Sequence, residues 1–193
     1  VIHAEETEIT IKGDAVFEGN KANSKGGVIW DPGSTLTIED GVKIANNSAQ
    51  DGGAIYIEGS NAVIGKATFE GNLARGWGGA ICAKTCDSLE LNGTAFTENK
   101  ASGAWPANGG AIYFAEGGTL AVNEDTAFER NEANNHGGAI FYTVGDALTV
   151  ADGVTFTNNH ANNNNGGAIS AQDTTVTIGE AVFEKNTALA WGG

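Results

Sequence analysis

The stretch FEGNLARGWGGAI, residues 69–81, contains the two motifs that decide the fold. The first motif, F-x-x-N-x-A, occurs seven times along the 193-residue chain if one copy with Ile44 in place of Phe is included. A Gly-Gly pair follows each copy, and successive pairs are 26 to 31 residues apart. This period is typical of a solenoid of stacked coils, whereas a propeller blade would need about 40 residues.

Three short stretches of each period alternate apolar and polar residues, which predicts three strands that each bury one face. The first stretch follows Gly-Gly and has inward residues such as Ile55 and Ile57. The second stretch has inward residues such as Leu36 and Ile38, and the third contains the Phe of the first motif. We therefore predict an all-β, right-handed parallel β-helix with three short strands per coil and about seven coils of 26–31 residues. At about 4.8 Å per coil the rod would be roughly 34 Å long.

Residues 1–193 form a single β-helix segment in this interpretation. If the end of the sequence were joined to its start, Gly192-Gly193 would be followed by Val1-Ile2, just as Gly26-Gly27 is followed by Val28-Ile29. Neither end carries an obvious polar cap, and open β-helix ends are adhesive edges. We expect the chain to be either a fragment of a longer rod or a unit that stacks head to tail into a filament.

The composition argues against several classes of partner. With 24 acidic and 10 basic side chains the formal net charge is −14, which repels nucleic acid and anionic lipid surfaces. No stretch approaches the roughly 20 apolar residues of a membrane span. We therefore expect no nucleic-acid binding and no membrane insertion by this segment.

The Asn of the first motif is expected to be structural. Asn tolerates left-handed backbone and bonds to its own neighbourhood, which suits the bend after a strand. Stacked coils would align these side chains in an internal amide ladder, in which buried polar groups satisfy one another. The alternative is a row of ligand-binding amides. The ladder would consist of Asn20, Asn47, Asn72, Asn99, Asn131, Asn159 and Asn186.

A row of aromatic side chains is predicted on the outer face of the strand after Gly-Gly, because these residues alternate with the inward Ile. Aligned aromatics could bind a sugar or a protein, since exposed apolar surface usually marks a contact site. One alternative is that the side chains of this strand point the other way, so that the row helps to fill the core. The other is that long turns cover the row. The row consists of Trp30, Tyr56, Cys82, Tyr113, Phe141 and Ser170.

The corner between the Asn and Gly-Gly varies most in length. Additional residues around Ala104-Trp105-Pro106 lengthen it in one coil, and Trp77 and Trp191 lie beside the same corner in other coils. Insertions in a solenoid become loops on one side, often the side that recognises a partner. We predict a partner contact at this edge, especially at Trp105 and Trp77, with a packed loop as the alternative.

Acidic residues recur at the corner before the Phe strand and could hold Ca²⁺. The nine-residue calcium-binding pattern is absent, however, so solvated turns are the simpler explanation. No basic residue recurs beside an acidic cluster, as a polysaccharide-cleaving site would require, and the three His residues lack metal-ligand spacing. We expect no enzymatic activity, no metal and no cofactor. The acidic residues are Asp14, Glu39, Asp40, Glu124, Asp125, Asp152 and Glu180.

The two cysteines, Cys82 and Cys86, lie on either side of the corner Ala83-Lys84-Thr85. A four-residue separation across a turn can close a disulfide if the backbone bends there. The sequence favours this disulfide, with two free thiols as the alternative.

The repeated motifs resemble those of the chlamydial-type polymorphic outer membrane proteins. Five copies of G-G-A-I alternate with six of F-x-x-N over essentially the whole chain, although only two cysteines are present. The resemblance implies an autotransporter passenger: a secreted β-helix, exposed at the outer-membrane surface, that adheres to host cells. The Gly-Ala-Ile parts of the tetrapeptide lie at residues 53–55, 79–81, 110–112, 138–140 and 167–169.

We therefore expect a non-enzymatic, extracellular passenger segment that acts in adhesion and display at the cell surface. Its partner would be a host-cell or surface receptor, either protein or glycan. One alternative is a structural repeat unit that self-associates head to tail, through its end coils, into an extracellular filament. A further alternative is a β-helix that binds or cleaves a polysaccharide.

Overall fold

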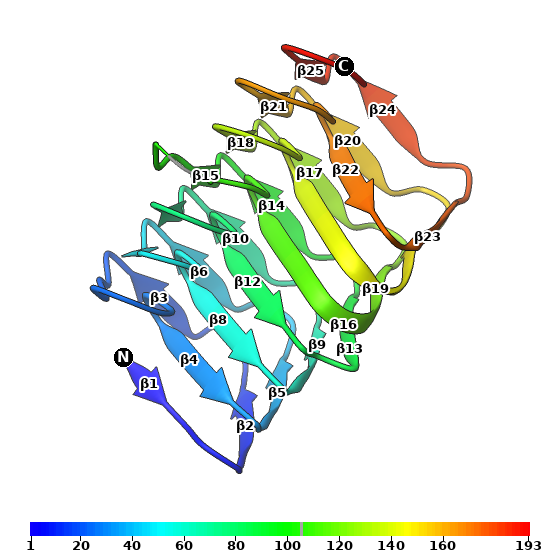
Figure 1. Cartoon of the computed structure of the whole chain (residues 1–193). Helices are drawn as coiled ribbons and strands as arrows, with labels where there is room; N and C mark the ends of the chain where they lie inside the picture. Colours follow the sequence, from blue (N-terminus) through cyan, green and yellow to red (C-terminus); the bar gives the residue numbers. More distant parts are fainter. Residues whose placement is uncertain (105) are drawn as a thin grey trace.

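The chain folds into a stack of seven coils, with its two termini at opposite ends of the stack (Figure 1). The computed structural model describes residues 1–104 and 106–193. Over these residues the regular elements are strands with no helix among them, and strands of successive coils pair in parallel. The predicted all-β parallel β-helix of seven coils is confirmed.

Each coil begins with a strand after Gly-Gly and continues with a second strand after a short turn. Strands in the first position are β1 (Ile2–His3), β4 (Ile29–Pro32), β8 (Ile55–Glu58), β12 (Ile81–Lys84) and β22 (Ile169–Gln172). Strands in the second position are β2 (Glu8–Ile11), β5 (Thr35–Ile38), β9 (Asn61–Ile64), β13 (Ser88–Leu91) and β23 (Thr175–Ile178). In two coils one long strand spans both positions, namely β16 (Ile112–Val122) and β19 (Ile140–Val150).

The third strand contains the Phe of the first motif, and a fourth strand of two residues follows it. Third strands are β3 (Val16–Glu18), β6 (Lys43–Ala45), β10 (Thr68–Glu70), β14 (Ala95–Thr97), β17 (Ala127–Glu129), β20 (Thr155–Thr157) and β24 (Val182–Glu184). Fourth strands are β7 (Ser48–Ala49), β11 (Leu73–Ala74), β15 (Lys100–Ala101), β18 (Glu132–Ala133), β21 (His160–Ala161) and β25 (Thr187–Ala188). First and second strands share one 12-stranded sheet, and the others form sheets of seven and six strands.

The fourth strand is a feature that the alternation of residues did not predict, because two residues are too few to show a period. The bend that creates it lies at the residue before the ladder Asn, for example Glu98 and Arg130, whose φ angles are 55° and 52°. The expectation that the Asn itself adopts left-handed backbone is therefore wrong. Its amide secures the bend from the next position.

The core consists of columns in which like residues stack from coil to coil. Phe69, Phe96, Phe128 and Phe156 pair in register, and their ring centroids are 4.8–4.9 Å apart. All four are completely buried. Burial of such a side chain contributes about 1.5–3 kcal/mol, so the repetition of one Phe per coil supplies much of the stability.

The Gly-Gly corner is explained at Gly52 and Gly53. Gly52 has a φ of 59°, and a Cβ there would lie 2.1 Å from the carbonyl oxygen of Ile55. A Cβ on Gly53 would lie 2.1 Å from the carbonyl oxygen of Gly79 in the next coil. The first glycine thus permits the turn, and the second permits the coils to approach each other.

Asp31 interrupts one column of the core. It pairs in register with Ile57, is completely buried, and its Oδ1 accepts a hydrogen bond from the backbone N–H of Ser34 at 3.1 Å. Its Oδ2 is one of three buried side-chain atoms without a hydrogen-bond partner among the described residues. A buried carboxylate without a full set of partners is costly.

We expect Asp31→Val to raise the free energy of unfolding by about 1–3 kcal/mol, because it replaces an incompletely bonded charge with an apolar side chain. The N–H of Ser34 keeps a second acceptor, the hydroxyl of Ser60 at 2.9 Å. Urea unfolding followed by circular dichroism measures the change. A lower urea midpoint for the variant would show that the hydrogen bond of the Asp31 carboxylate outweighs the cost of burying it.

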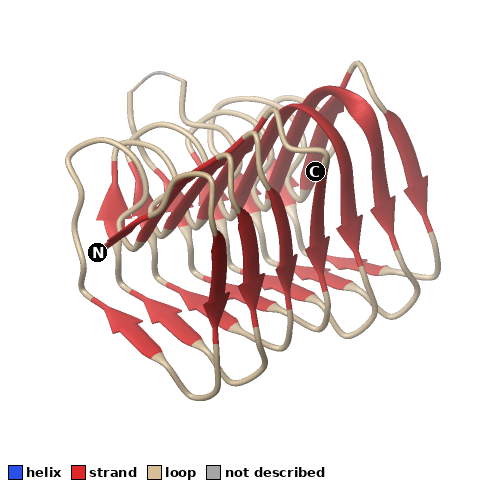
Figure 2. Cartoon of the chain, turned by 90° about the horizontal axis from the view of Figure 1, so that it is seen from below, coloured by secondary structure: helices blue, strands red, loops and turns tan. Residues whose placement is uncertain are grey.

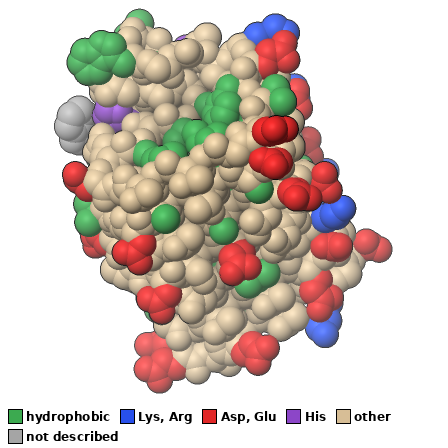
Figure 3. All heavy atoms as spheres, turned by 90° about the vertical axis from the view of Figure 1, so that its right-hand side faces the viewer, with side chains coloured by type: hydrophobic (Ala, Val, Ile, Leu, Met, Phe, Trp, Pro, Cys, Tyr) green, Lys and Arg blue, Asp and Glu red, His purple; other side chains and the backbone are tan. Residues whose placement is uncertain are grey.

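The outer surface carries the acidic charge of the chain. On the face shown in Figure 3, acidic side chains are spread widely, whereas Lys and Arg lie along one edge. Several basic side chains pair with an acidic one in a neighbouring coil, as Lys43 does with Glu70 at 3.1 Å and Lys100 with Glu132 at 2.8 Å. Each such exposed pair contributes little stability. The pairs do mean that these lysines already neutralise carboxylates of the same chain.

Candidate functional site

Seven loop segments lie along one edge of the stack, each between the end of the Asn-x-Ala motif and Gly-Gly (Figure 2). Their lengths and residue types differ from coil to coil, whereas the sheets repeat. We call this surface the corner edge. It consists of residues 23–25, 50–51, 75–77, 102–104, 106–108, 134–136, 162–165 and 189–191, with residue 105 outside the described part.

The corner edge covers the aromatic row predicted on the outer face of the first strands. Tyr56, Tyr113 and Phe141 are only 3%, 7% and 5% exposed. With Cys82 and Ala115 they form a second buried cluster outside the main core. The expectation that this row faces solvent is therefore wrong, and the alternative in which turns cover the row describes the structure.

Trp30 and Trp77 are half-buried and pack against the same cluster. The ring of Trp77, which belongs to a corner segment, stacks on Tyr113 with centroids 5.2 Å apart. Tyr113 in turn stacks on Phe141 at 5.6 Å. Aromatic stacking adds about 0.5–1.5 kcal/mol beyond the area buried, so these side chains hold the corner segments onto the sheet instead of offering a flat binding surface.

Two lysines fix the corner segments further. The Nζ of Lys25 lies 4.3 Å from the centre of the Tyr56 ring, and the Nζ of Lys84 lies 4.3 Å from that of Trp77. Each contact contributes about 0.5–1 kcal/mol at a partly exposed site. Burial raises the pKa of Tyr113 to about 12 and also raises the pKa of Tyr56, so both phenols are neutral at physiological pH.

The predicted contact at Trp105 lies outside the described residues. The rest of its segment is anchored at both ends. Asn134 donates to the carbonyl oxygens of Ser102 and Gly103 at 2.8 and 3.1 Å, while Asn108 accepts from the backbone N–H of His136 at 3.1 Å. The longest corner segment therefore begins and ends at fixed points on the edge.

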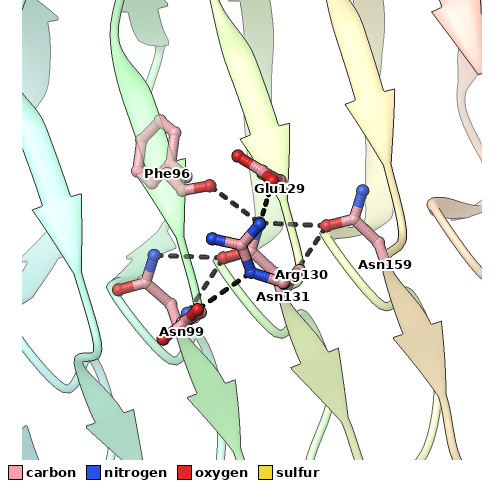
Figure 4. A network of polar contacts seen from close by, with 7 residues as sticks. Phe96, Asn99, Glu129, Arg130, Asn131 and Asn159 are labelled. Carbon is pink, nitrogen blue, oxygen red and sulfur yellow. Dashed lines mark hydrogen bonds and ion pairs between the residues drawn. The ribbon is translucent and has the colours of Figure 1, made fainter.

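The seven motif asparagines form one continuous ladder inside the rod. Figure 4 shows three of them, Asn99, Asn131 and Asn159. Asn131 is representative: its Nδ2 donates to Asn159 Oδ1 and to the Phe96 carbonyl, and its Oδ1 accepts from the backbone N–H and the Nδ2 of Asn99, all at 3.0 Å. The five central members are completely buried. Because these five amides are buried and already bond to protein groups, they leave no surface for a ligand.

A second amide network lies outside the rod, on the corner edge. Asn162 donates to Asn134 Oδ1 at 3.0 Å, and Asn163 donates to the Asn134 carbonyl at 2.6 Å. Asn164 also bonds to Asn135. The sequence interpretation missed this network, although the run of four asparagines at residues 162–165 is a signal that could have indicated it.

Cys82 and Cys86 are both free thiols, so the predicted disulfide is wrong. Cys82 points outward into the cluster beneath the corner edge, whereas Cys86 points into the main core. The turn between them contains Thr85 with a φ of 53°, and this bend sends the two side chains to opposite faces of the sheet.

We expect neither thiol to react readily in the folded chain. Burial raises the pKa of Cys86 to about 11 and raises that of Cys82 even with Lys84 nearby, so the thiolate fraction at pH 8 is small. Under non-reducing conditions a thiol reagent should detect both groups only after unfolding in guanidinium chloride. If no thiol appeared after unfolding, a disulfide would be present after all.

Acidic residues at the corner before the Phe strand cap turns of the next coil. Asp40 Oδ1 accepts from the backbone N–H of Lys66 at 2.7 Å, and Asp152 Oδ1 accepts from that of Glu180 at 2.6 Å. In the part of the chain that the structure describes, no three His, Cys, Asp or Glu side chains are grouped as metal ligands. The same part contains no helix long and apolar enough to cross a membrane.

A small hollow of about 190 Å³ lies where the corner edge meets the fourth strands of the first three coils. Lys21, Ser48, Gln50, Leu73 and Arg75 contribute to its lining. The hollow therefore combines cationic, amide and aliphatic groups on an otherwise acidic rod. Together with the exposed Trp191 and the outer amide network, it makes the corner edge the candidate interaction surface.

Stacked parallel strands, an internal amide ladder and loops on one edge define a structural repeat protein of the β-solenoid class. The chain belongs to the β-helix family, because the family model described as a right handed beta helix region matches residues 7–188. Neither the search of curated proteins nor the search of solved structures found a match.

Proposed function

We propose that this chain is a non-enzymatic passenger segment displayed at a cell surface, where its corner edge adheres to a protein or glycan receptor. One observation carries the proposal: the sheets repeat in register over seven coils, while the corner segments differ in length and chemistry. A fixed scaffold with variable loops on one side is typical of solenoids that recognise partners.

The exposed groups of the corner edge suit a glycan or a polar protein surface. Trp191 is 76% exposed, and Arg75 also faces solvent. An aromatic ring can pack on the apolar face of a sugar, and amides such as Asn163 can bond to its hydroxyl groups. Because the aromatic row beneath is buried, recognition would fall to these outer side chains.

The family includes both pectate-lyase-like enzymes and proteins without catalytic activity. The non-enzymatic proposal is supported by the positions of the basic side chains, which form ion pairs on the surface of the rod. Lys66 pairs with Asp125 two coils away, and Arg130 pairs with Glu98 in the neighbouring coil, so that these basic groups lie on the surface and do not gather with several carboxylates in a cleft. The proposed extracellular, outer-membrane location is supported by the resemblance of the G-G-A-I and F-x-x-N repeats to the polymorphic outer membrane proteins.

Binding of the fluorescently labelled chain to epithelial cells and to a glycan array tests this function. We expect Trp191→Ala and Trp105→Ala to weaken binding by about 1–2 kcal/mol, roughly 5- to 30-fold. Val63→Ala is the matched control, because Val63 is 40% exposed on a sheet face away from the corner edge. Absence of binding by the unmodified chain, or an equal loss in the control, would contradict the proposal.

A further inference from the structure

Two basic side chains have no carboxylate partner among the described residues, and both line the same hollow. Of the ten basic side chains, seven pair with a carboxylate, and Lys84 lies over the ring of Trp77. The remaining two, Lys21 and Arg75, are exposed and contribute to the hollow of about 190 Å³ beside the fourth strands. On a rod with a net charge of −14, this is the place where unpaired cations converge.

The hollow forms because a short side chain lies between longer ones. Ser48 in β7 pairs in register with Lys21 of the preceding coil and with Leu73 of the following coil. The chain then turns into the corner edge, where Gln50 and Arg75 complete the lining. Coils therefore bound the hollow on both sides of Ser48, and its shape follows from the order of side chains within the stack.

The lining supplies hydrogen-bond donors for an anion and further polar groups around it. Lys21 carries three N–H donors, and Arg75 carries five in a planar fork that matches a carboxylate. The hydroxyl of Ser48 and the amides of Asn23 and Gln50 both donate and accept, as the hydroxyl groups of a sugar require. None of the described residues that line the hollow is Asp or Glu. The set suits a ligand with one negative group and several hydroxyl groups.

The size of the hollow and the pairing of its strands favour a sugar over a peptide. Its volume is below the about 300–1,000 Å³ of pockets for drug-sized ligands, so a single ring fits better than a longer segment. A peptide that binds a sheet typically adds a strand to an open edge, but β7 is paired on both sides here. Leu73 is 38% exposed and offers an apolar side chain to the carbon face of a ring.

The charge of the rod restricts how many negative groups the ligand carries. At an ionic strength of 0.15 M the Debye length is about 8 Å, so Lys21 and Arg75 act mainly on a group inside the hollow. Further negative groups along the ligand would lie over a surface that is acidic overall and would be repelled. An isolated carboxylate in an oligosaccharide is therefore favoured over a dense polyanion.

We propose that this hollow binds an acidic sugar, a ring with a single carboxylate, as part of an oligosaccharide. Arg75 and Lys21 bind the carboxylate, and Ser48 and the two amides bind hydroxyl groups. The inference rests on the adhesive function proposed above and deepens it, because it names the class of glycan that the corner edge recognises. Such a ring occurs at the end of a glycan, as sialic acid, or within it, as a uronic acid, and both share this chemistry.

Isothermal titration calorimetry of the 193-residue chain tests the proposal with sialyllactose, a hyaluronan tetrasaccharide and lactose. At least one acidic probe should bind about tenfold or more tightly than neutral lactose, and which of them binds distinguishes a terminal from an internal acidic ring. Arg75→Gln and Lys21→Gln should each weaken this binding about tenfold or more, because each removes a charge-assisted hydrogen bond. Ser48→Leu keeps both cations but fills the hollow, and it should abolish binding.

Lys66→Gln is the matched control, because it removes the same charge from an exposed lysine that pairs with Asp125 elsewhere on the rod. It should bind like the unmodified chain. N-acetylglutamic acid α-amide carries a carboxylate without a sugar ring and should bind at least about tenfold more weakly than the acidic oligosaccharide. Circular dichroism and a cooperative melt establish that the variants fold.

The proposal is overturned if neither acidic oligosaccharide binds more tightly than lactose, or if the glutamate amide binds as tightly as they do. It is also overturned if folded Arg75→Gln or Ser48→Leu binds like the unmodified chain. Adhesion to cells that depends on Trp191, without binding of either acidic probe, would remove this inference and leave the proposed function. Binding of an acidic probe without adhesion to cells would do the reverse, so the two proposals fail separately.

Discussion

Replacement of Asn131 by Ala should lower the free energy of unfolding by about 3–5 kcal/mol, the upper range for a single substitution. The variant removes the acceptor for two donors of Asn99 and the donor to the Phe96 carbonyl. These groups are completely buried, so water cannot replace the lost partner. One substitution therefore leaves several unsatisfied polar groups in the centre of the rod.

Urea unfolding, followed by circular dichroism, measures this loss. Asn186→Ala provides the comparison, because Asn186 is the last member of the ladder and only half-buried, so its removal should cost about 1 kcal/mol. Equal midpoints for the two variants would mean that the ladder bonds contribute no more in the interior than at the end, contrary to this account.

Phe128→Ala should have a similar effect, with a loss of about 3–5 kcal/mol. The Phe128 ring lies between those of Phe96 and Phe156, with centroids 4.9 and 4.8 Å away, and it is completely buried. Its removal would leave a cavity in a column whose neighbours are held in place by the strand pairing on both sides. The column cannot collapse without breaking the register.

The matched comparison is Phe183→Ala, because Phe183 is 45% exposed and, among the described residues, stacks on the ring of Phe156 alone. Its loss should destabilise the chain by less than half as much. Phe128→Leu should fall between the two alanine variants. A smaller loss for Phe128→Ala than for Phe183→Ala would show that the coils relax around cavities and that the columns are not rigid.

The repeat in the sequence predicted the fold because each coil uses the same positions for the same contacts. Residues at equal positions, such as Ile55 and Ile81, become neighbours only if the coils stack, and alternation tells which of them point inward. The internal position of the motif asparagines follows from the same logic. The periodicity of the sequence therefore predicts the contacts that every coil repeats.

The corner edge could not be predicted in the same way, because its contacts are not repeated. Trp77 covers Tyr113, which is 36 residues later, and no spacing in the chain announces that the loop folds back over the sheet. The orientation of Cys82 and Cys86 depended on the backbone of a single residue, Thr85. Features that occur once are decided by local geometry, which alternation does not reveal.

The register between coils has a consequence for the gene as well as for the protein. Each strand pairs with its equivalents one coil away, so every internal junction presents the same ladder to its neighbours. Recombination that adds or removes one whole period would join surfaces that already fit. The length of such a rod can therefore change in evolution by whole coils, while each corner segment diversifies independently of the others.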